Sequence, residues 1–210
     1  MSLDREFYVT LAREAEIIFE EKRSEFIATA RHVKNEQEAA EFIARVSENY
    51  KDATHNVYAY YLASGAHAKY SDDGEPQGTA GAPVLEIIKR SGGEDIAVVV
   101  TRYFGGIKLG AGGLVRAYAE AAKRAIEAAE IVTYRLYTEF SLECSYSEHR
   151  LFESRFFSLG AKIDDCKFGA GVTMKCAVPA SEYQKILSAV SELSSGKLSP
   201  QIIGERFDFE

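Results

Sequence analysis

The chain has 210 residues, of which 46% are hydrophobic and 27% charged, an ordinary composition for a folded protein. This composition excludes a disordered or collagen-like chain, and the length suits one large domain or two small ones. The longest aliphatic run, Ile96 to Val100, is far shorter than the roughly 20 residues that a membrane span needs. The amino-terminal residues contain no apolar stretch long enough for a signal peptide. We therefore expect a cytoplasmic protein that makes no membrane contact.

The formal net charge is −7, which argues against a surface that binds nucleic acid over its whole area. Any site for a polyanion must therefore be local. The three cysteines, Cys144, Cys166 and Cys176, have neither disulfide nor zinc-site spacing, and we interpret them as small hydrophobic residues. No metal or cofactor is expected.

The first 132 or so residues predict an α+β unit. Asn35 and Glu38 have the spacing of a capping box, and Pro83 suits the first turn of a helix. Apolar periodicity supplies the other elements. In chain order, the expected elements are a strand or hairpin over 17–33, a helix after Asn35, a strand over 56–62, a helix around Pro83, a strand over 96–103 and a helix over 110–130.

The last third predicts the order βαββαβ, which is the arrangement of a ferredoxin-like domain. Its first strand alternates apolar and polar residues, and its two helices carry apolar stripes that end at Gly160 and Gly196. The expected elements are a strand over 137–146, a helix with Ser147 as its cap, a hairpin of strands 161–168 and 172–178, a helix from Ser181 and a strand over 198–209. We place the domains at 1–133 and 134–210.

The segment YSDDGEPQGTAGAP, residues 70–83, combines carboxylates with turn-forming residues. It predicts a chain of turns in which Thr79 caps the following helix. Alternatively, Asp72, Asp73 and Glu75 hold a cation or orient a basic partner at the mouth of a cleft. The three acidic residues lack the alternation of an EF-hand loop, so a dedicated calcium site is not expected.

The segment TRYFGGIKLGAGGLVRA, residues 101–117, places glycines between an apolar strand and a long helix, where backbone N–H groups can bind an anion. No acidic residue occurs from Ile96 to Ala119, although the acidic content of the chain predicts about three or four in such a window. The loop matches neither nucleotide fingerprint, GxxxxGK[ST] or GxGxxG. The phosphate-binding candidates are Arg102, Lys108, Gly110, Gly112, Gly113 and Arg116.

Two alternatives apply to this segment. The glycines could serve only to let the helix pack closely on the sheet. Tyr103 and Phe104 could stack on bases, but a Tyr-Phe pair at the end of a strand favours a place in the core. His55, at the start of a predicted strand, is a further functional candidate, whereas we interpret His32, His67 and His149 as solvated or hydrogen-bonded.

Four segments together resemble the signature of the YigZ/IMPACT family. They are KRSEFIA at 22–28, HNVYAY at 55–60, SDDGEPQGTAG at 71–81 and VVVTRYFGGIKLGAGGLVRAY at 98–118. The resemblance covers essentially the whole chain, because the bacterial YigZ branch also carries a carboxy-terminal ferredoxin-like domain. One departure is Glu25, at a position that is usually basic, which would weaken a polyanion surface along that strand.

The resemblance implies an amino-terminal domain with the left-handed βαβ crossover of a ribosomal protein and of the fourth domain of elongation factor G. It likewise implies a second domain similar to the fifth domain of that factor. The eukaryotic IMPACT branch regulates translation through protein contacts. The family has no established catalytic residue, so the resemblance implies none for this chain.

Three functions follow as hypotheses. The first is a non-catalytic, translation-associated factor that binds structured RNA or the ribosome through the glycine loop and its cations. The second is a protein-binding regulator of translation or stress responses. The third is an enzyme acting on a phosphorylated small molecule, with His55 as acid or base and Asp72 or Asp73 positioning a metal. The oligomeric state is left open.

Overall fold

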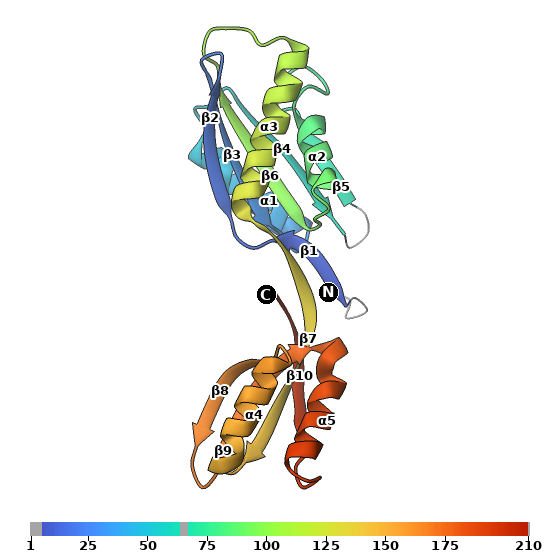
Figure 1. Cartoon of the computed structure of the whole chain (residues 1–210). Coiled ribbons are helices and arrows are strands. Elements are labelled where there is room, and N and C mark those ends of the chain that lie inside the picture. Colours follow the sequence, from blue (N-terminus) through green and yellow to red (C-terminus); the bar gives the residue numbers. More distant parts are fainter. Residues whose placement is uncertain (1–5, 64–66, 210) are drawn as a thin grey trace. The chain divides into compact units, whose positions relative to one another are not determined.

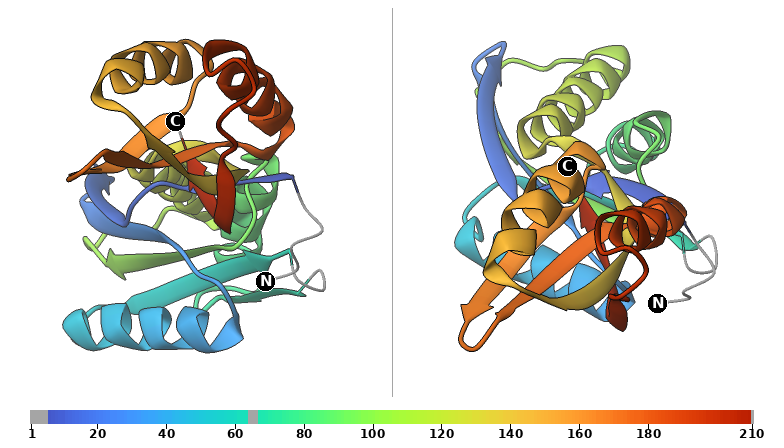
Figure 2. Two further views of the ribbon diagram at one scale, coloured as in Figure 1. Left: turned by 90° about the horizontal axis from the view of Figure 1, so that it is seen from below. Right: turned by 60° about the horizontal axis from the view of Figure 1, so that its bottom comes forward.

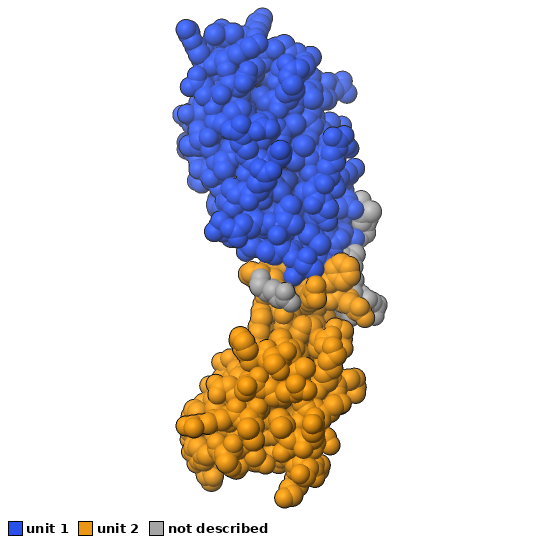
Figure 3. All heavy atoms as spheres, in the orientation of Figure 1, with its two compact units in different colours: residues 1, 8–133 blue, residues 2–7, 134–210 orange. Residues whose placement is uncertain are grey.

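The computed structural model describes residues 6–63 and 67–209, which fold into two compact units (Figure 3). Residues 8–133 form unit 1, and residues 134–209 form unit 2 together with Glu6 and Phe7. In the described part of the chain, no helix combines the length and the apolar character that crossing a membrane requires.

Unit 1 is a five-stranded sheet with helices on both faces (Figure 1). The strand order is β2-β3-β6-β4-β5, and each neighbouring pair is antiparallel. Consequently β3 runs parallel to β4, with α1 as the crossover, and β5 runs parallel to β6, with α2 as the crossover. The elements up to residue 129 are β1 (Phe7–Leu11), β2 (Ala15–Glu21), β3 (Ser24–His32), α1 (Glu36–Asn49), β4 (His55–Leu62), β5 (His67–Ser71), α2 (Gly81–Arg90), β6 (Ile96–Tyr103) and α3 (Ala111–Ala129).

The central strand β6 is buried on both faces, which explains its uninterrupted apolar sequence. Val98 and Val100 face α2 and α3, whereas Ala97 and Val99 face α1. Figure 2 shows α1 on one side of the sheet and α2 and α3 on the other. Arg102, two residues beyond Val100, therefore points toward the side covered by α3.

Local signals account for most of unit 1. Of the two alternatives for residues 17–33, a strand or a hairpin, the hairpin forms, with Lys22 and Arg23 at its turn, both at positive φ (48° and 64°). The amide of Glu38 donates to Asn35 Oδ1 at 2.9 Å, which confirms the predicted cap of α1. Strand β5 was not expected, because its side chains are mostly exposed and lack apolar alternation.

Unit 2 has the predicted order βαββαβ. Its sheet has five strands in the order β1-β7-β9-β8, with β10 also paired to β7. The β8–β9, β9–β7 and β7–β10 pairs are antiparallel, and α4 and α5 cover one face. Phe140, Phe152 and Phe156 lie at the centre of this core. The elements are β7 (Ile131–Cys144), α4 (Tyr146–Ser158), β8 (Lys162–Phe168), β9 (Val172–Pro179), the short 3-10 helix η1 (Ala180–Glu182), α5 (Tyr183–Leu193) and β10 (Gln201–Phe209).

Two predicted helix starts in unit 2 are wrong. Ser145, not Ser147, caps α4, because Glu148 completes a capping box with Ser145. The strand before it consequently ends at Cys144. Ser181 lies in η1, and α5 begins two residues later at Tyr183. The predicted end at Gly160 is confirmed, since Gly160 follows the cap of α4 at φ 75°. Helix α5 ends at Leu193, three residues before Gly196, and Ser195 takes the left-handed position after its cap at φ 53°.

Candidate functional site

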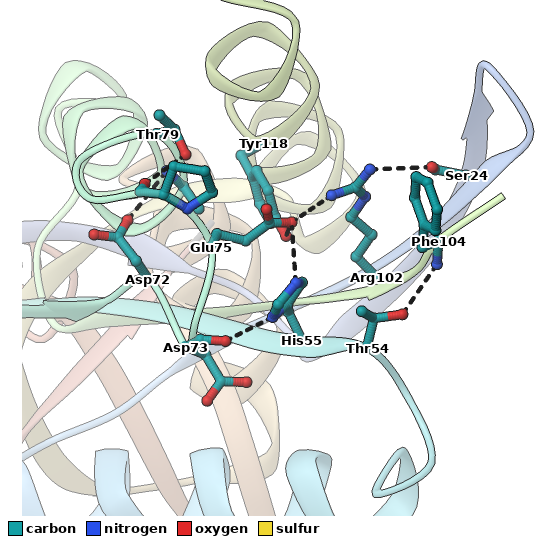
Figure 4. A network of polar contacts seen from close by, with 12 residues as sticks. Ser24, Thr54, His55, Asp72, Asp73, Glu75, Thr79, Arg102, Phe104 and Tyr118 are labelled. Carbon is teal, nitrogen blue, oxygen red and sulfur yellow. Dashed lines mark hydrogen bonds and ion pairs between the residues drawn. The ribbon is translucent and has the colours of Figure 1, made fainter. Parts of the chain in front are cut away.

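The two glycine-bearing segments singled out in the sequence meet at one end of the unit 1 sheet. His55 begins β4, Arg102 lies opposite it in register on β6, and Ser24 begins β3 on the other side of β6. Glu75 reaches this point from the loop before α2, and Tyr118 reaches it from α3 (Figure 4). Five side chains from different elements therefore form one polar network.

Glu75 is the centre of this network. Its Oε1 accepts a hydrogen bond from Arg102 Nη1 at 2.6 Å and another from the Tyr118 hydroxyl at 2.8 Å. The side chains of Glu75 and Arg102 are only 4% and 6% exposed. A buried carboxylate requires such charge-assisted partners, because desolvation without them would be costly.

Arg102, a predicted phosphate ligand, is engaged inside the protein. Besides its ion pair with Glu75, its Nη2 donates to Ser24 Oγ at 3.2 Å. Its guanidinium lies over the rings of Phe26 and Phe104, at 5.6 and 5.5 Å from their centroids. Among the described side chains, Arg102 Nε is the one buried polar atom without a hydrogen-bond partner. The geometry thus makes Arg102 a structural cation that supports the neighbouring loop.

His55 joins the network at its solvent-facing edge, where its side chain is 19% exposed. Nδ1 lies 2.7 Å from the carbonyl oxygen of Asp73, which can only accept, so Nδ1 carries a hydrogen. Nε2 lies 3.8 Å from Glu75 Oε1. His55 therefore links the acidic loop to the buried carboxylate.

Asp72 binds backbone amides. Its carboxylate accepts from the N–H groups of Gly78, Ala80 and Gly81 at 2.8 to 3.1 Å, which satisfies the amino-terminal end of α2. The prediction that Thr79 caps this helix is wrong, because the Thr79 hydroxyl donates to the Pro76 carbonyl at 2.6 Å and Ala80 occupies the cap position.

Asp73 also has a local partner, since its carboxylate accepts from the Asn56 amide. The hydrogen bonds of Asp72 therefore agree with the interpretation of residues 70–83 as a chain of turns. The Glu75 carboxylate is already paired with Arg102. Within residues 6–63 and 67–209, no group of three or more His, Cys, Asp or Glu side chains could hold a metal ion.

The remaining phosphate-binding candidates gather at the start of α3. Gly110 occupies the cap position at φ 73° without a side-chain hydrogen bond, and the first turn contains no acidic residue. A Cβ on Gly112 would lie 3.7 Å from Arg116 Nη1, so the Arg116 guanidinium reaches back to the first turn. Lys108 and Arg116 are exposed, and in the described structure neither side chain has a hydrogen-bond or ion-pair partner. We call this set, Lys108, Gly110, Gly112, Gly113 and Arg116, the α3 amino-terminal site.

The turn of the β2–β3 hairpin lies beside the loop that precedes this site. A Cβ on Gly105 would come within 1.8 Å of the Arg23 carbonyl oxygen, so the two backbones are in direct contact. Lys22 and Arg116 line one open groove along α3, together with both basic and acidic neighbours. Glu25 pairs with Tyr103 in register and therefore faces the opposite side of the sheet, away from α3.

Sequence reasoning missed three residues that shape the site: Ser24, Thr54 and Tyr118. Ser24 Oγ accepts from the Gly105 amide at 3.2 Å, and Thr54 Oγ1 accepts from the Phe104 amide at 3.1 Å. Tyr118 lies in the helix predicted over 110–130, where nothing local marks it as a partner of a buried carboxylate. Ser24 lies within the KRSEFIA segment, and this membership in a family motif could have identified it as a site residue. Nothing in the local sequence marks Thr54.

The other histidines and the cysteines have local roles. His32 Nδ1 lies 2.9 Å from Thr10 Oγ1, and burial lowers the pKa of His32. His149 Nε2 lies 3.6 Å from Cys166 Sγ. All three cysteines are free, and burial raises the pKa of Cys176 to about 12, which keeps its thiol protonated and unreactive.

Tyr118→Phe is expected to make unit 1 less sensitive to alkaline pH. Burial raises the pKa of the Tyr118 phenol, and the nearby Glu75 carboxylate raises it further. A group whose pKa is higher in the folded state stabilises fully below its unfolded pKa of about 10, and that contribution is lost as the pH rises further. Urea unfolding at successive pH values should show that, above about pH 10, the free energy of unfolding falls more steeply with pH for the parent than for the variant. If the free energies of unfolding of the parent and the variant change with pH in parallel, the Tyr118 phenol does not have a raised pKa in the folded protein.

The fold and the site define a two-domain α+β protein in which an Arg-Glu network supports a glycine-rich loop. Residues 22–126 match the Impact N-terminal domain, and residues 142–197 match a domain of unknown function (DUF1949). The IMPACT family member YvyE of Bacillus subtilis is 38% identical over 197 residues, which are 91% of this chain and 88% of that protein. The chain belongs to the IMPACT family.

Other comparisons agree. The IMPACT family member YigZ of Escherichia coli is 33% identical over 194 residues, covering 90% of this chain and 94% of that protein. Protein IMPACT of Rattus norvegicus is 33% identical over 94 residues, covering 43% of this chain and 30% of that protein. A solved structure described as a hypothetical protein matches with a TM-score of 0.60 and 31% identity, covering 95% of this chain and 98% of that one. The family resemblance seen in the sequence motifs is confirmed.

Proposed function

We propose that this protein is a non-catalytic, translation-associated factor that binds structured RNA, including RNA of the ribosome, through the α3 amino-terminal site. The observation that carries the proposal is electrostatic. Lys108 and Arg116, two exposed cations that have no partner among the described residues, flank the first turn of α3 at the positive end of a 19-residue helix dipole, and that turn has no carboxylate.

Cations are unfavourable at a helix amino terminus, so this arrangement favours a bound anion. Helix α1 places Asn35 and Glu38 at its start, α4 places Ser145 and Glu148, and α2 receives the Asp72 carboxylate. In α3 the free N–H groups of the first turn are accompanied by cations and by glycines that leave the backbone open. A phosphate group would satisfy both the amides and the two side chains.

Two further features support RNA as the polyanion and translation as the context. Lys22 and Arg23, at the hairpin turn beside Gly105, add two cations close to the site. The chain also belongs to the IMPACT family, whose eukaryotic branch the sequence resemblance connects with translation.

Replacing Lys108 and Arg116 together by alanine is expected to lower the affinity for structured RNA at least tenfold at ~100 mM salt. If both side chains contact phosphate, the slope of log affinity against log salt should fall by roughly 1.4–1.8, the value for two lost contacts. Fluorescence anisotropy with a labelled RNA hairpin, repeated across a salt series, measures both quantities.

The matched control is the double substitution Lys89→Ala and Arg90→Ala. These residues end α2, at the end of the sheet where β6 begins, and their removal changes the net charge equally. The control should retain the parental salt slope. Equal binding by the parent and the Lys108/Arg116 variant would overturn the proposal.

A capture experiment from lysate, with and without nuclease, distinguishes RNA from protein as the partner. If RNA mediates the association with ribosomes, the captured components should disappear after nuclease treatment and also in the Lys108/Arg116 variant. Components that persist after digestion would favour a protein-binding regulator instead.

A further inference from the structure

Phe104, the residue that follows β6, is an exposed aromatic side chain on a fixed backbone. It is 46% exposed, and its amide donates to Thr54 Oγ1 at 3.1 Å. The next amide, that of Gly105, donates to Ser24 Oγ at 3.2 Å. Ser24 of β3 and Thr54, just before β4, thus hold the backbone at Phe104 and Gly105 from two sides, and Figure 4 shows the contact with Thr54.

The Arg102 guanidinium supports one side of the ring. It lies over Phe104, 5.5 Å from the ring centroid, and it is itself held by Glu75 and Ser24. The ring therefore rests on a planar, buried cation that cannot move to solvent, while nearly half of the residue stays accessible. Such an arrangement reduces the conformational entropy that a stacking partner would otherwise have to remove.

Tyr103 takes no part in this surface. It lies on the opposite face of the sheet, where its hydroxyl donates to Asp52 at 2.8 Å. The expectation that the Tyr-Phe pair belongs to the core therefore fails for Phe104. An exposed aromatic ring next to a cationic, glycine-rich loop is the combination with which proteins bind unpaired nucleobases.

We propose that Phe104 stacks on an unpaired nucleobase whose strand continues to the α3 amino-terminal site, so that the structured RNA presents a single-stranded segment or a flipped-out base at the contact. This inference rests on the proposed function and specifies its ligand. Phe104 and Gly110 are six residues apart, which limits the distance between their Cα atoms to about 20 Å. An oligonucleotide of about ten residues spans such a distance.

The chain contains no tryptophan, so Phe104→Trp introduces a single indole at the proposed contact. Its emission should be quenched by a ten-residue single-stranded RNA and should not change with inorganic polyphosphate, which supplies the charge without bases. Phe104→Leu, which keeps an apolar side chain over Arg102 without the aromatic face, should lower affinity for that RNA by about 5- to 150-fold, the range for one lost stack.

Ile107→Ala is the matched control, because Ile107 is a 41% exposed apolar residue of the same loop that cannot stack. It should bind within twofold of the parent, and a perfect RNA duplex should bind the parent more weakly than the single strand. If Phe104→Leu binds normally while the Lys108/Arg116 variant is impaired, the stacking proposal is overturned and the proposed function stands. If the parent binds neither RNA nor polyphosphate, both are overturned.

Discussion

Arg102→Met is expected to lower the free energy of unfolding of unit 1 by about 3–5 kcal/mol, the cost of removing one partner from a buried ion pair. Glu75 Oε1 would lose its charged donor at 2.6 Å while its side chain remains 4% exposed. The Tyr118 hydroxyl alone would then support a buried carboxylate. Hydrogen exchange of the β6 and α3 amides under increasing urea reports on unit 1 without interference from unit 2.

The control for this substitution is Arg124→Met, which breaks a 2.7 Å pair with Glu120 whose side chains are 49% and 43% exposed. Exposed pairs contribute little, so this loss should stay below about 1 kcal/mol. Adding Glu75→Gln to Arg102→Met should recover part of the stability, because no uncompensated charge then remains buried. If Arg102→Met costs no more than Arg124→Met, Glu75 does not depend on Arg102.

The position of Arg102 shows which part of the site the sequence could predict. The start of α3, with its cations and its glycines, is a local pattern, and its residues lie together as the sequence indicates. The pairing of Arg102 with Glu75 joins strand β6 to the loop before α2 through tertiary folding, so the local sequence gave no sign that Arg102 already has an ion-pair partner. The same holds for Ser24 and Tyr118, whose roles depend on strand register and helix packing.

The same distinction between local patterns and tertiary contacts decides which elements of the fold could be predicted. Strands and helices with strong apolar periodicity, such as β6 and α3, were located to within a residue or two. The edge strand β5 was missed, because pairing with β4 defines it and its own side chains are largely exposed. The α4 cap could have been found, since Ser145 and Glu148 form the capping-box spacing and Ser147 does not.

Gly105→Ala is expected to destabilise unit 1 by about 1–3 kcal/mol or more, as overpacking does. The added Cβ would lie 1.8 Å from the Arg23 carbonyl oxygen and 2.0 Å from its carbon, and neither backbone atom can rotate away. Either the loop before α3 or the hairpin turn at Lys22 and Arg23 must shift. Hydrogen exchange at the β2–β3 turn, together with urea unfolding, measures the displacement and its cost.

Gly112→Ala separates this effect from the general cost of changing a glycine. Gly112 lies in the first turn of α3, and the nearest atom to its added Cβ is Arg116 Nη1 at 3.7 Å, the end of a flexible side chain. Alanine should therefore stabilise the helix by roughly 0.5–1 kcal/mol through its lower conformational entropy. Opposite signs for the two substitutions would establish that Gly105 is required for close approach of two backbones, whereas equal stability would mean that the hairpin turn and the loop are not in contact.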